Sequence, residues 1–273
     1  MNNCYFTKQL RASKRVNGSV EARAGYFSVA LNTSVKAEMT VTNHTALYRF
    51  TFPTDGSPTK KPTDGGSAND TEPEPLPYSP LILADLTDLQ DSRSDGRIVV
   101  DPDTGRITGN GTFKPSFGIG TYELHFCADF QGAAIRDTGV FQGIRAGSQF
   151  KSLRTFEDNV NRPPLPGGAW VRFRAPESDR ILVRVGLSFF STSQACRNAE
   201  SEIPGFDFEA TRAQAEDAWR EKLSSISVDN TGVDKSLQRL FWSGVYRSFI
   251  SPQDYTGKEF SGPRQRVVLR CFS

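Results

Sequence analysis

Histidine and cysteine are scarce in this chain, and those present form no metal or redox motif. The 273 residues include two histidines, His44 and His125. The four cysteines are Cys4, Cys127, Cys196 and Cys271. None lies at the close spacing of a zinc or thioredoxin-type motif. The sequence allows one long-range disulfide without identifying its partners, and it predicts that Cys127, within an apolar strand pattern, is a small core residue.

The chain also lacks a large charge of either sign and long apolar runs. Lys and Arg number 33 against 31 Asp and Glu, for a formal net charge of +2. This balance gives no electrostatic reason to expect a nucleic acid or an anionic membrane as a partner. No apolar run reaches the ~20 residues of a membrane span. We therefore expect no nucleic-acid partner and no membrane partner.

A recognisable secretory signal is missing too. Residues 1–19 carry positive charge but no apolar core of the ~7–15 residues that a signal peptide has. Glycosylation sequons of the form Asn-x-Ser/Thr nevertheless recur in the first half of the chain. They begin at Asn17, Asn32, Asn43, Asn69 and Asn110. The compartment is thus unknown: the sequons weakly favour a secretory or extracellular location, and a cytosolic one is compatible with the sequence.

Motifs for catalysis are absent. No Gly-rich phosphate loop occurs, and no pair of carboxylates stands out as the acid and base of glycoside hydrolysis. His125 and Cys127 point to the same side of a strand, but the sequence specifies no Asp to complete a Cys-His-Asp site. His44, in an Asn-His-Thr turn, is expected to be structural or solvent-exposed. From the residues alone we assign no catalytic residue.

The segment Asp-Pro-Asp-Thr-Gly, from Asp101 to Gly105, has a spacing that suggests calcium binding. The EF-hand pattern fails, however, because Gly105 is at the fifth position and Thr112 stands where a bidentate Glu is needed. Pro at the second turn position and Gly where a positive φ is needed predict a hairpin turn instead. We therefore assign no metal ligand.

Alternating apolar and polar residues predict many short strands. Residues 25–52 have the pattern of a strand meander, and Pro80–Asp88 is a continuous apolar strand suited to burial on both faces. Residues 53–80, rich in Pro, Gly, Asp, Thr and Ser, are expected to form a flexible surface insertion. Further strands are predicted at 98–108, 117–130, 169–176 and 180–191. With no βαβ alternation, the pattern predicts a mainly β fold, an antiparallel β-sandwich.

Helical periodicity begins only late in the chain. Residues 194–202 are expected to form a short helical turn. An amphipathic helix follows, capped by Asp207, with its apolar stripe at Phe208, Ala215, Trp219, Leu223 and Ile226. A second helix, capped by Asp234 and ended by Ser251-Pro252, has its stripe at Leu237, Phe241, Val245 and Phe249. Trp219 and Trp242 lie at helical spacing, which favours a packing role over a sugar-binding platform.

Several stretches, taken in order, carry a family resemblance. The clearest is VRVGLSFFSTSQACRNAESEIPGFDFEATRAQAEDAWREKLSSISV (Val183–Val228), followed by SLQRLFWSGVYRSFISPQDYTG (Ser236–Gly257). Upstream stand AGYFSVAL (Ala24–Leu31) and GRITGNGTF (Gly105–Phe113). Together they resemble glycoside hydrolase family 92, the calcium-dependent exo-α-mannosidases. The resemblance covers roughly residues 20–257, and the tail KEFSGPRQRVVLRCFS departs from it.

The resemblance implies an architecture for the whole chain. Residues 1–203 become an N-terminal β-sandwich of the galactose-mutarotase-like supersandwich type, with 53–80 as the insertion. Residues 204–230 become a helical linker, and residues 231–273 the truncated start of an (α/α)6 catalytic barrel with an atypical tail. The family's inverting mechanism uses one carboxylic acid and one carboxylate, and calcium helps to distort the bound mannose. The acid, the base and the calcium ligands belong to the barrel, so none is carried over to a residue here.

The implied function is that of the N-terminal carbohydrate-binding or structural domain of an α-mannosidase-like enzyme acting on the α-mannosides of N-glycans. Mannose-containing glycans are then its ligands, the chain alone is inactive, and the barrel is the partner expected to cover its C-terminal helices. One alternative is a stand-alone carbohydrate-binding β-sandwich. Another is a peptide:N-glycanase-like protein, which requires a Cys-His-Asp site around Cys127.

Overall fold

The computed structural model describes residues 8–53, 79–86, 92–115, 119–156 and 164–250. The chain divides into two compact units, residues 1–222 and residues 223–273. The first contains two β-sheets and most of the helical residues. Within the described residues, the second is dominated by a single helix.

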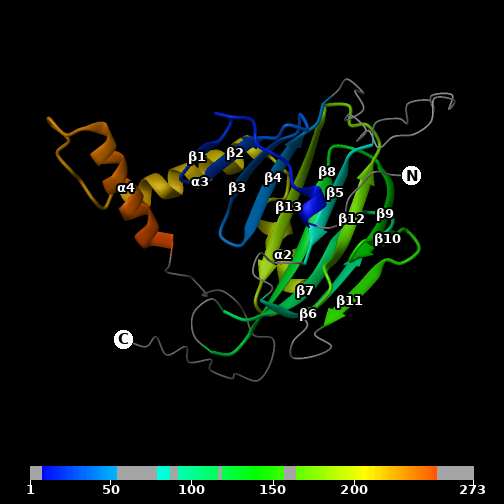
Figure 1. Cartoon of the computed structure of the whole chain (residues 1–273). Helices are drawn as coiled ribbons and strands as arrows, with labels where there is room; N and C mark the ends of the chain where they lie inside the picture. The colour runs from blue at the N-terminus through cyan, green and yellow to red at the C-terminus, as the bar shows by residue number, and fades with distance from the viewer. Residues whose placement is uncertain (1–7, 54–78, 87–91, 116–118, 157–163, 251–273) are drawn as a thin grey trace. The chain divides into compact units, whose positions relative to one another are not determined.

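Two antiparallel sheets form the layers of the first unit (Figure 1). The larger has nine strands, in the spatial order β1 (Glu21–Arg23), β2 (Tyr26–Ala30), β3 (Lys36–Val41), β4 (Thr45–Thr51), β13 (Arg180–Ser188), β8 (Tyr122–Gln131), β7 (Ile107–Phe113), β6 (Arg93–Val100) and β11 (Ser152–Phe156). The smaller has the order β10 (Arg145–Gly147), β9 (Ile135–Gln142), β12 (Gly167–Phe173) and β5 (Leu81–Asp85). The predicted antiparallel β-sandwich is confirmed.

Alternate residues of the facing strands fill the space between the sheets. Ile181 and Val183 of β13, Ile98 of β6 and Val171 and Phe173 of β12 are all buried in one core cluster. Because side chains alternate sides along a strand, the intervening residues of β13 point to the outer face of the large sheet. Helices pack on that face.

Helix α2 (Thr192–Glu202) lies on the outer side of β13 and β8. The Ser191 hydroxyl accepts a hydrogen bond from the backbone N–H of Gln194 at 3.1 Å and so caps its first turn. Gly186 of β13 allows the close approach, since an added Cβ would collide with the Ala195 carbonyl and lie 2.9 Å from the Ala199 Cβ. The predicted helical turn over 194–202 is therefore confirmed, and it extends two residues further toward the N-terminus.

Helix α3 (Phe208–Leu223) follows, with the predicted cap. The Asp207 carboxylate accepts from the backbone N–H of Ala210 at 3.0 Å. The buried residues of α3 are Phe208, Thr211 and Ala215, and the Phe208 ring meets the Tyr26 ring of β2 edge to face at 6.4 Å. The first half of the predicted stripe is thus packed on the sheet.

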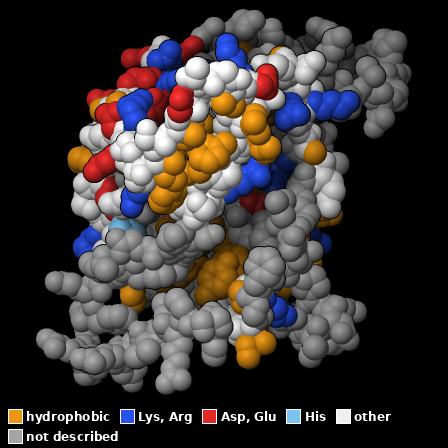
Figure 2. Space-filling view, turned by 90° about the vertical axis from the view of Figure 1, so that its left-hand side faces the viewer, with side chains coloured by type: hydrophobic (Ala, Val, Ile, Leu, Met, Phe, Trp, Pro, Cys, Tyr) orange, Lys and Arg blue, Asp and Glu red, His pale blue; other side chains and the backbone are white. Residues whose placement is uncertain are grey.

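Helix α4 (Lys235–Ile250) belongs to the second unit and has no buried residue. Its predicted cap is confirmed, since the Asp234 carboxylate accepts from the backbone N–H of Ser236 at 2.7 Å. Its most exposed apolar residues are Leu237, Leu240, Phe241 and Ile250. Figure 2 shows hydrophobic side chains at the molecular surface, bordered by charged ones. No helix in the described part of the chain is long and apolar enough to cross a membrane.

Strand β5 departs from the prediction. The sequence favoured burial on both faces, but all five of its residues are only half-buried. The reason is topological, because β5 is the terminal strand of the small sheet and has a neighbour on one side only. The predicted insertion over residues 53–80 lies almost entirely outside the described residues. The short helix α1 (Lys8–Arg11), which the sequence did not predict, pairs with β5 through Arg11 and Asp85.

Candidate functional site

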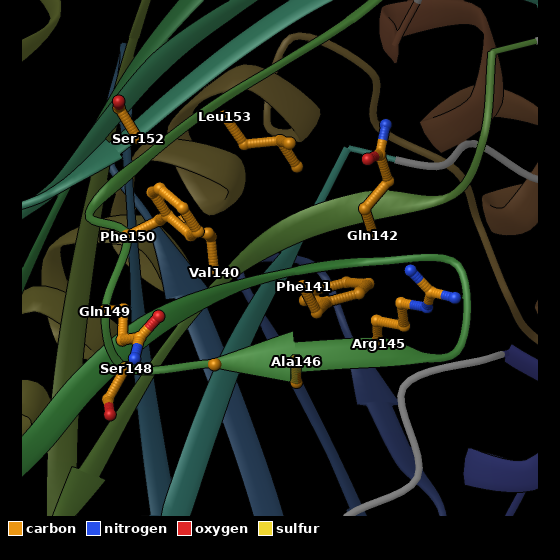
Figure 3. A pocket seen from close by; sticks show the side chains of 11 residues that line it. Val140, Phe141, Gln142, Arg145, Ala146, Ser148, Gln149, Phe150, Ser152 and Leu153 are labelled. Atoms are coloured by element: carbon orange, nitrogen blue, oxygen red, sulfur yellow. The ribbon is translucent and has the colours of Figure 1, made fainter.

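A hollow of about 610 Å³ lies between the edges of the two sheets (Figure 3). Strand β11 is the last strand of the large sheet, and β10 is the last of the small one. The β9–β10 hairpin and residues 148–150, which join β10 to β11, complete its walls. Gly143 makes the hairpin turn with a φ of +60°, in the left-handed region that glycine favours.

The hollow has an apolar base and a polar rim. Val140 and Phe141 are buried at its base, and Leu153 is half-buried. The polar side chains of the rim are Gln142, Arg145, Ser148, Gln149 and Ser152, all exposed. In Figure 3, Gln142 and Arg145 lie toward one end of the hollow, and Ser148 and Gln149 toward the other. None of the five rim side chains has a hydrogen-bond or ion-pair partner among the described residues.

The chemistry of this rim suits reversible binding and not bond breaking. Arg145 is the only charged side chain among the described residues that line the hollow. Amides and hydroxyls both donate and accept hydrogen bonds, and the Phe150 ring, 71% exposed, adds an apolar surface. With no carboxylate at the rim, the hollow offers neither an acid–base pair nor ligands for a hard cation.

A second hollow, of about 480 Å³, opens between β5 and the large sheet. Its lining is largely apolar and includes Tyr48, Phe50, Phe126 and Val185, which pack against the core cluster. It therefore lacks the convergent polar groups that orient a ligand.

Ion pairs on the outer face of the large sheet hold the helices in place. The Asp129 carboxylate of β8 accepts from the guanidinium of Arg184 at 2.9 Å and from that of Arg106 at 2.6 Å. Arg106 also pairs with Glu200 of α2 at 2.6 Å, and Arg184 donates to the carbonyl of Ile203 at 2.7 Å. These contacts link α2 and its C-terminal end to the sheet.

Glu38 of β3 is the centre of a second such cluster. It accepts from Arg49 Nε and from the Tyr26 hydroxyl, each at 2.8 Å. Burial opposes the ionisation of Glu38, but the hydrogen bonds from Arg49, Tyr26 and Lys36 outweigh it and lower its pKa to about 2. Arg49 also pairs with Glu209 of α3 at 2.7 Å. The cluster therefore links the large sheet to α3 through ion pairs.

His44 fastens the end of α2 to the β3–β4 turn. Its Nδ1 lies 2.7 Å from Glu202 Oε1, and its backbone N–H donates to Glu202 Oε2 at 2.9 Å. Burial raises the pKa of Glu202, but the hydrogen bonds from Thr42 and His44 outweigh this and lower it overall. The expectation of a structural role for His44 is confirmed.

Cys127 forms a disulfide with Cys196 of α2, with the two Cα atoms 5.0 Å apart. Cys127 is fully buried, as the core prediction required, but its sulfur is not a free thiol. His125 contacts Thr192 at 3.4 Å and Glu123 at 3.6 Å. The hypothesis of a thiol nucleophile at Cys127 is therefore wrong. The Cys-His-Asp site that the sequence suggested around Cys127 is wrong for the same reason. Cys4 and Cys271 lie outside the described residues.

The Asp101–Gly105 segment is a hairpin turn between β6 and β7, as predicted. Hydrogen bonds from Thr104, first through its backbone N–H, and from the backbone N–H of Asp103 lower the pKa of Asp101. Gly105 has a φ of +70°. Among the described residues, no group of three or more His, Cys, Asp and Glu side chains is placed to hold a metal ion.

Neither tryptophan that the sequence singled out forms an exposed platform. Trp219 of α3 is half-buried, in keeping with a packing role. Trp242 of α4 is half-buried beside Phe241, with ring centroids 5.3 Å apart.

Sequence reasoning missed the hollow beside β10. Its polar residues are not a motif, and they come from the segment FQGIRAGSQFKSL (residues 141–153), which reads as short strands and turns. The available signal is a lone aromatic, Phe150, next to Gly, Ser and Gln, a composition typical of an exposed turn and not of a core strand.

Two family models match the chain. The glycosyl hydrolase family 92 N-terminal domain matches residues 1–188, and the glycosyl hydrolase family 92 catalytic domain matches residues 194–269. A curated protein of Arthroderma benhamiae, described as an uncharacterized secreted glycosidase, is 47% identical over 262 residues, which are 94% of this chain and 32% of the relative. The chain thus spans about a third of that relative's length.

Solved structures show the same fold. A family GH92 inverting mannosidase from Bacteroides thetaiotaomicron matches with a TM-score of 0.69 and 17% identity, over 92% of this chain and 29% of that one. A GH92 family glycosyl hydrolase matches with a TM-score of 0.68 and 20% identity, over 88% and 30%. A family GH92 α-mannosidase from the same Bacteroides species matches with a TM-score of 0.57 and 20% identity, over 80% and 26%. At these identities the likeness concerns the fold.

Proposed function

The chain belongs to glycoside hydrolase family 92, and on this premise we propose that it is the N-terminal carbohydrate-binding and structural part of an α-mannosidase-type enzyme. The substrates of that enzyme would be the α-mannosides of N-glycans. Support for this substrate class comes from the structural neighbours that are described as mannosidases. Because the chain spans about a third of its curated relative, the activity of the whole protein is part of the proposal.

One observation carries this proposal: helices α2 and α3 are fixed to the sandwich, while α4 exposes its apolar side chains. A disulfide and the Asp129 and Glu38 clusters hold the first two helices. Leu240 and Leu237 of α4 are 69% and 56% exposed. Apolar side chains repeated along one helix are typical of a surface that another element covers. The proposed cover is the helical barrel of the catalytic domain.

The chain by itself is proposed to be inactive. Inverting hydrolysis requires a carboxylic acid whose pKa is raised enough to hold a proton. The described carboxyls with a shifted pKa, among them Glu38, Asp95 and Glu202, all shift downward. The calcium ligands of the full enzyme are proposed to lie in the catalytic barrel.

The test is an assay of the purified 273-residue chain on α-1,2-mannobiose with calcium. We expect no release of mannose above the rate without protein. A family 92 mannosidase in the same buffer is the positive control. Turnover by the chain comparable to that control would contradict the proposal.

The alternative of a stand-alone carbohydrate-binding module is favoured by the hollow between β10 and β11, whose lining residues all belong to the sandwich. The two functions differ in whether another domain must cover the exposed apolar side chains of α4. A stand-alone module should remain monomeric with α4 exposed, whereas the domain of a larger enzyme should bind the separately produced barrel of a close relative. Co-purification of the two distinguishes them.

A secretory location is proposed as well. Disulfides persist in oxidising compartments, and the Cys127–Cys196 bond and the relative described as secreted both support it. Asn17, Asn32 and Asn43 are exposed, whereas the Asn110 amide donates to Glu123 within the sheet. After expression through a eukaryotic secretory route, mass spectrometry should find glycans on the three exposed sites and none on Asn110. A glycan on Asn110, or no glycan on any of the three exposed sites, would contradict this.

A further inference from the structure

We propose that the hollow between β10 and β11 is a binding site for a neutral α-mannose disaccharide unit. This inference rests on the proposed function for the identity of the sugar. The volume of the hollow, about 610 Å³, falls within the range of roughly 300–1,000 Å³ found for small-molecule sites. It therefore has room for two sugar rings.

The rim supplies the polar contacts that sugar hydroxyls need. Each hydroxyl is both a donor and an acceptor, and the amides of Gln142 and Gln149 offer one acceptor and two donor hydrogens apiece. Ser148 and Ser152 add hydroxyls. Since none of these side chains has a hydrogen-bond partner among the described residues, a ligand would not have to break protein contacts to use them.

Phe150 supplies the apolar contact. Its ring is 71% exposed on the segment that joins β10 to β11, and it has no aromatic partner among the described residues. An exposed aromatic ring that borders a polar hollow can cover the apolar C–H face of a sugar ring while the rim amides bind its hydroxyls. Figure 3 shows Phe150 beside Val140, at the end of the hollow where Ser148 and Gln149 lie.

Charge argues against a cationic ligand. Arg145 is the single charged side chain among the described lining residues, so a cation would be repelled. The other polar side chains of the rim are uncharged amides and hydroxyls, which suit a neutral polyol of moderate size.

The experiment is a calorimetric or NMR titration of α-1,2-mannobiose into the full 273-residue chain and three variants. Phe150→Ala and Gln149→Ala alter the hollow. Phe156→Ala is the matched control, because Phe156 is also an exposed aromatic, on β11, but does not line the hollow. We expect saturable binding that Phe150→Ala weakens about tenfold and that Phe156→Ala leaves unchanged. Circular dichroism confirms that each variant is folded.

Three outcomes would overturn the inference. The first is the absence of saturable binding by the unaltered chain. The second is binding that survives both hollow variants, which would leave the proposed carbohydrate-binding function standing but move the site elsewhere. The third is equal affinity for cellobiose, a β-linked glucose disaccharide, which would overturn the assignment to mannosides. None of these three results depends on whether the chain hydrolyses mannobiose.

Discussion

Cys127 of β8 and Cys196 of α2 are bonded across 69 residues of sequence, and the bond crosses from the outer face of the large sheet to the helix packed on it. The same helix packs closely on Gly186 of the neighbouring strand β13, where an added Cβ would collide with the Ala195 carbonyl oxygen. The covalent link and the close approach therefore fix one helix in one position. That helix precedes α3 and sets where the chain leaves the sandwich.

Removing the disulfide should lower stability substantially. A bond that closes a loop of this length contributes about 2–4 kcal/mol, mainly by restricting the unfolded chain. We expect the unfolding free energy of the Cys196→Ala variant to be lower by this amount. Its urea midpoint should fall accordingly. Urea denaturation followed by circular dichroism measures it. The Cys127→Ala/Cys196→Ala double variant is the control and should match the single one; an unchanged midpoint in both would show that the bond contributes nothing.

A single methyl group at Gly186 should be poorly tolerated. In the Gly186→Ala variant the new Cβ would collide with the carbonyl oxygen of Ala195, so α2 must move away from the sheet. We expect a loss of about 3 kcal/mol in unfolding free energy. Gly244→Ala on α4 is the matched control, because no atom lies within 4 Å of its added Cβ, and Ala should stabilise the helix by about 0.5–1 kcal/mol. Equal effects of the two substitutions would refute this account of the packing.

Acid should destabilise the sandwich through Glu38. Its pKa is lowered from 4.5 to about 2 in the folded protein, so the folded state holds fewer protons than the unfolded state between these values. The stabilisation is complete above about pH 4.5 and is lost as the pH falls toward 2. Urea midpoints measured from pH 6 to pH 2 should therefore decline in the unaltered chain and decline less in Glu38→Gln.

At pH 7 the same Glu38→Gln variant should be destabilised by roughly 3 kcal/mol, because Arg49 loses its buried charged partner and keeps only the exposed Glu209. The control is Asp217→Asn on α3, which removes an exposed pair with Arg220 whose side chains are 72% and 69% exposed. Exposed pairs contribute less than about 1 kcal/mol. Similar losses in the two variants would mean that burial does not increase the contribution of the Glu38 cluster to the unfolding free energy.

The exposed apolar side chains of α4 should cause self-association of the isolated chain. Leu240→Lys and Phe241→Lys together should reduce the sedimentation coefficient at high protein concentration and leave the circular dichroism spectrum unchanged. Gln238→Lys together with Ser243→Lys, which adds the same charge at two polar positions of α4, is the control. Limited proteolysis should also cut first beyond about residue 230, since α4 contributes no buried residue. A monomer that resists proteolysis throughout would contradict both expectations.

The elements most accurately predicted are those whose signal is local. The caps at Asp207 and Asp234 depend on a carboxylate next to the first helical turn, and both form hydrogen bonds with it. The turn at Asp101–Gly105 follows from the restricted φ of Pro102 and the positive φ of Gly105. The meander and the existence of strands β8 and β13 follow from strand periodicity. Such features need only residues that are close in the chain.

Features that join distant segments were beyond reach of the sequence. The partner of Cys127 depends on α2 lying over β8. The Asp129–Arg184 pair depends on β13 being the neighbour of β8, and the Arg49–Glu209 pair depends on α3 packing on the sheet. The half-burial of β5 depends on its place at a sheet edge, which its apolar sequence does not reveal. The hollow exists because two sheet edges meet, and no residue of its rim is unusual by itself.

The sequence by itself determined the mainly β body, the late helices and the membership of family 92, because periodicity, caps and ordered motifs are written in neighbouring residues. Only the tertiary structure determined which cysteines pair, how α2 packs on Gly186 and where the polar hollow beside β10 lies. The physical reason is that these depend on the distance between segments far apart in the chain. That distance is fixed by strand order and by the packing of helices on the sheet.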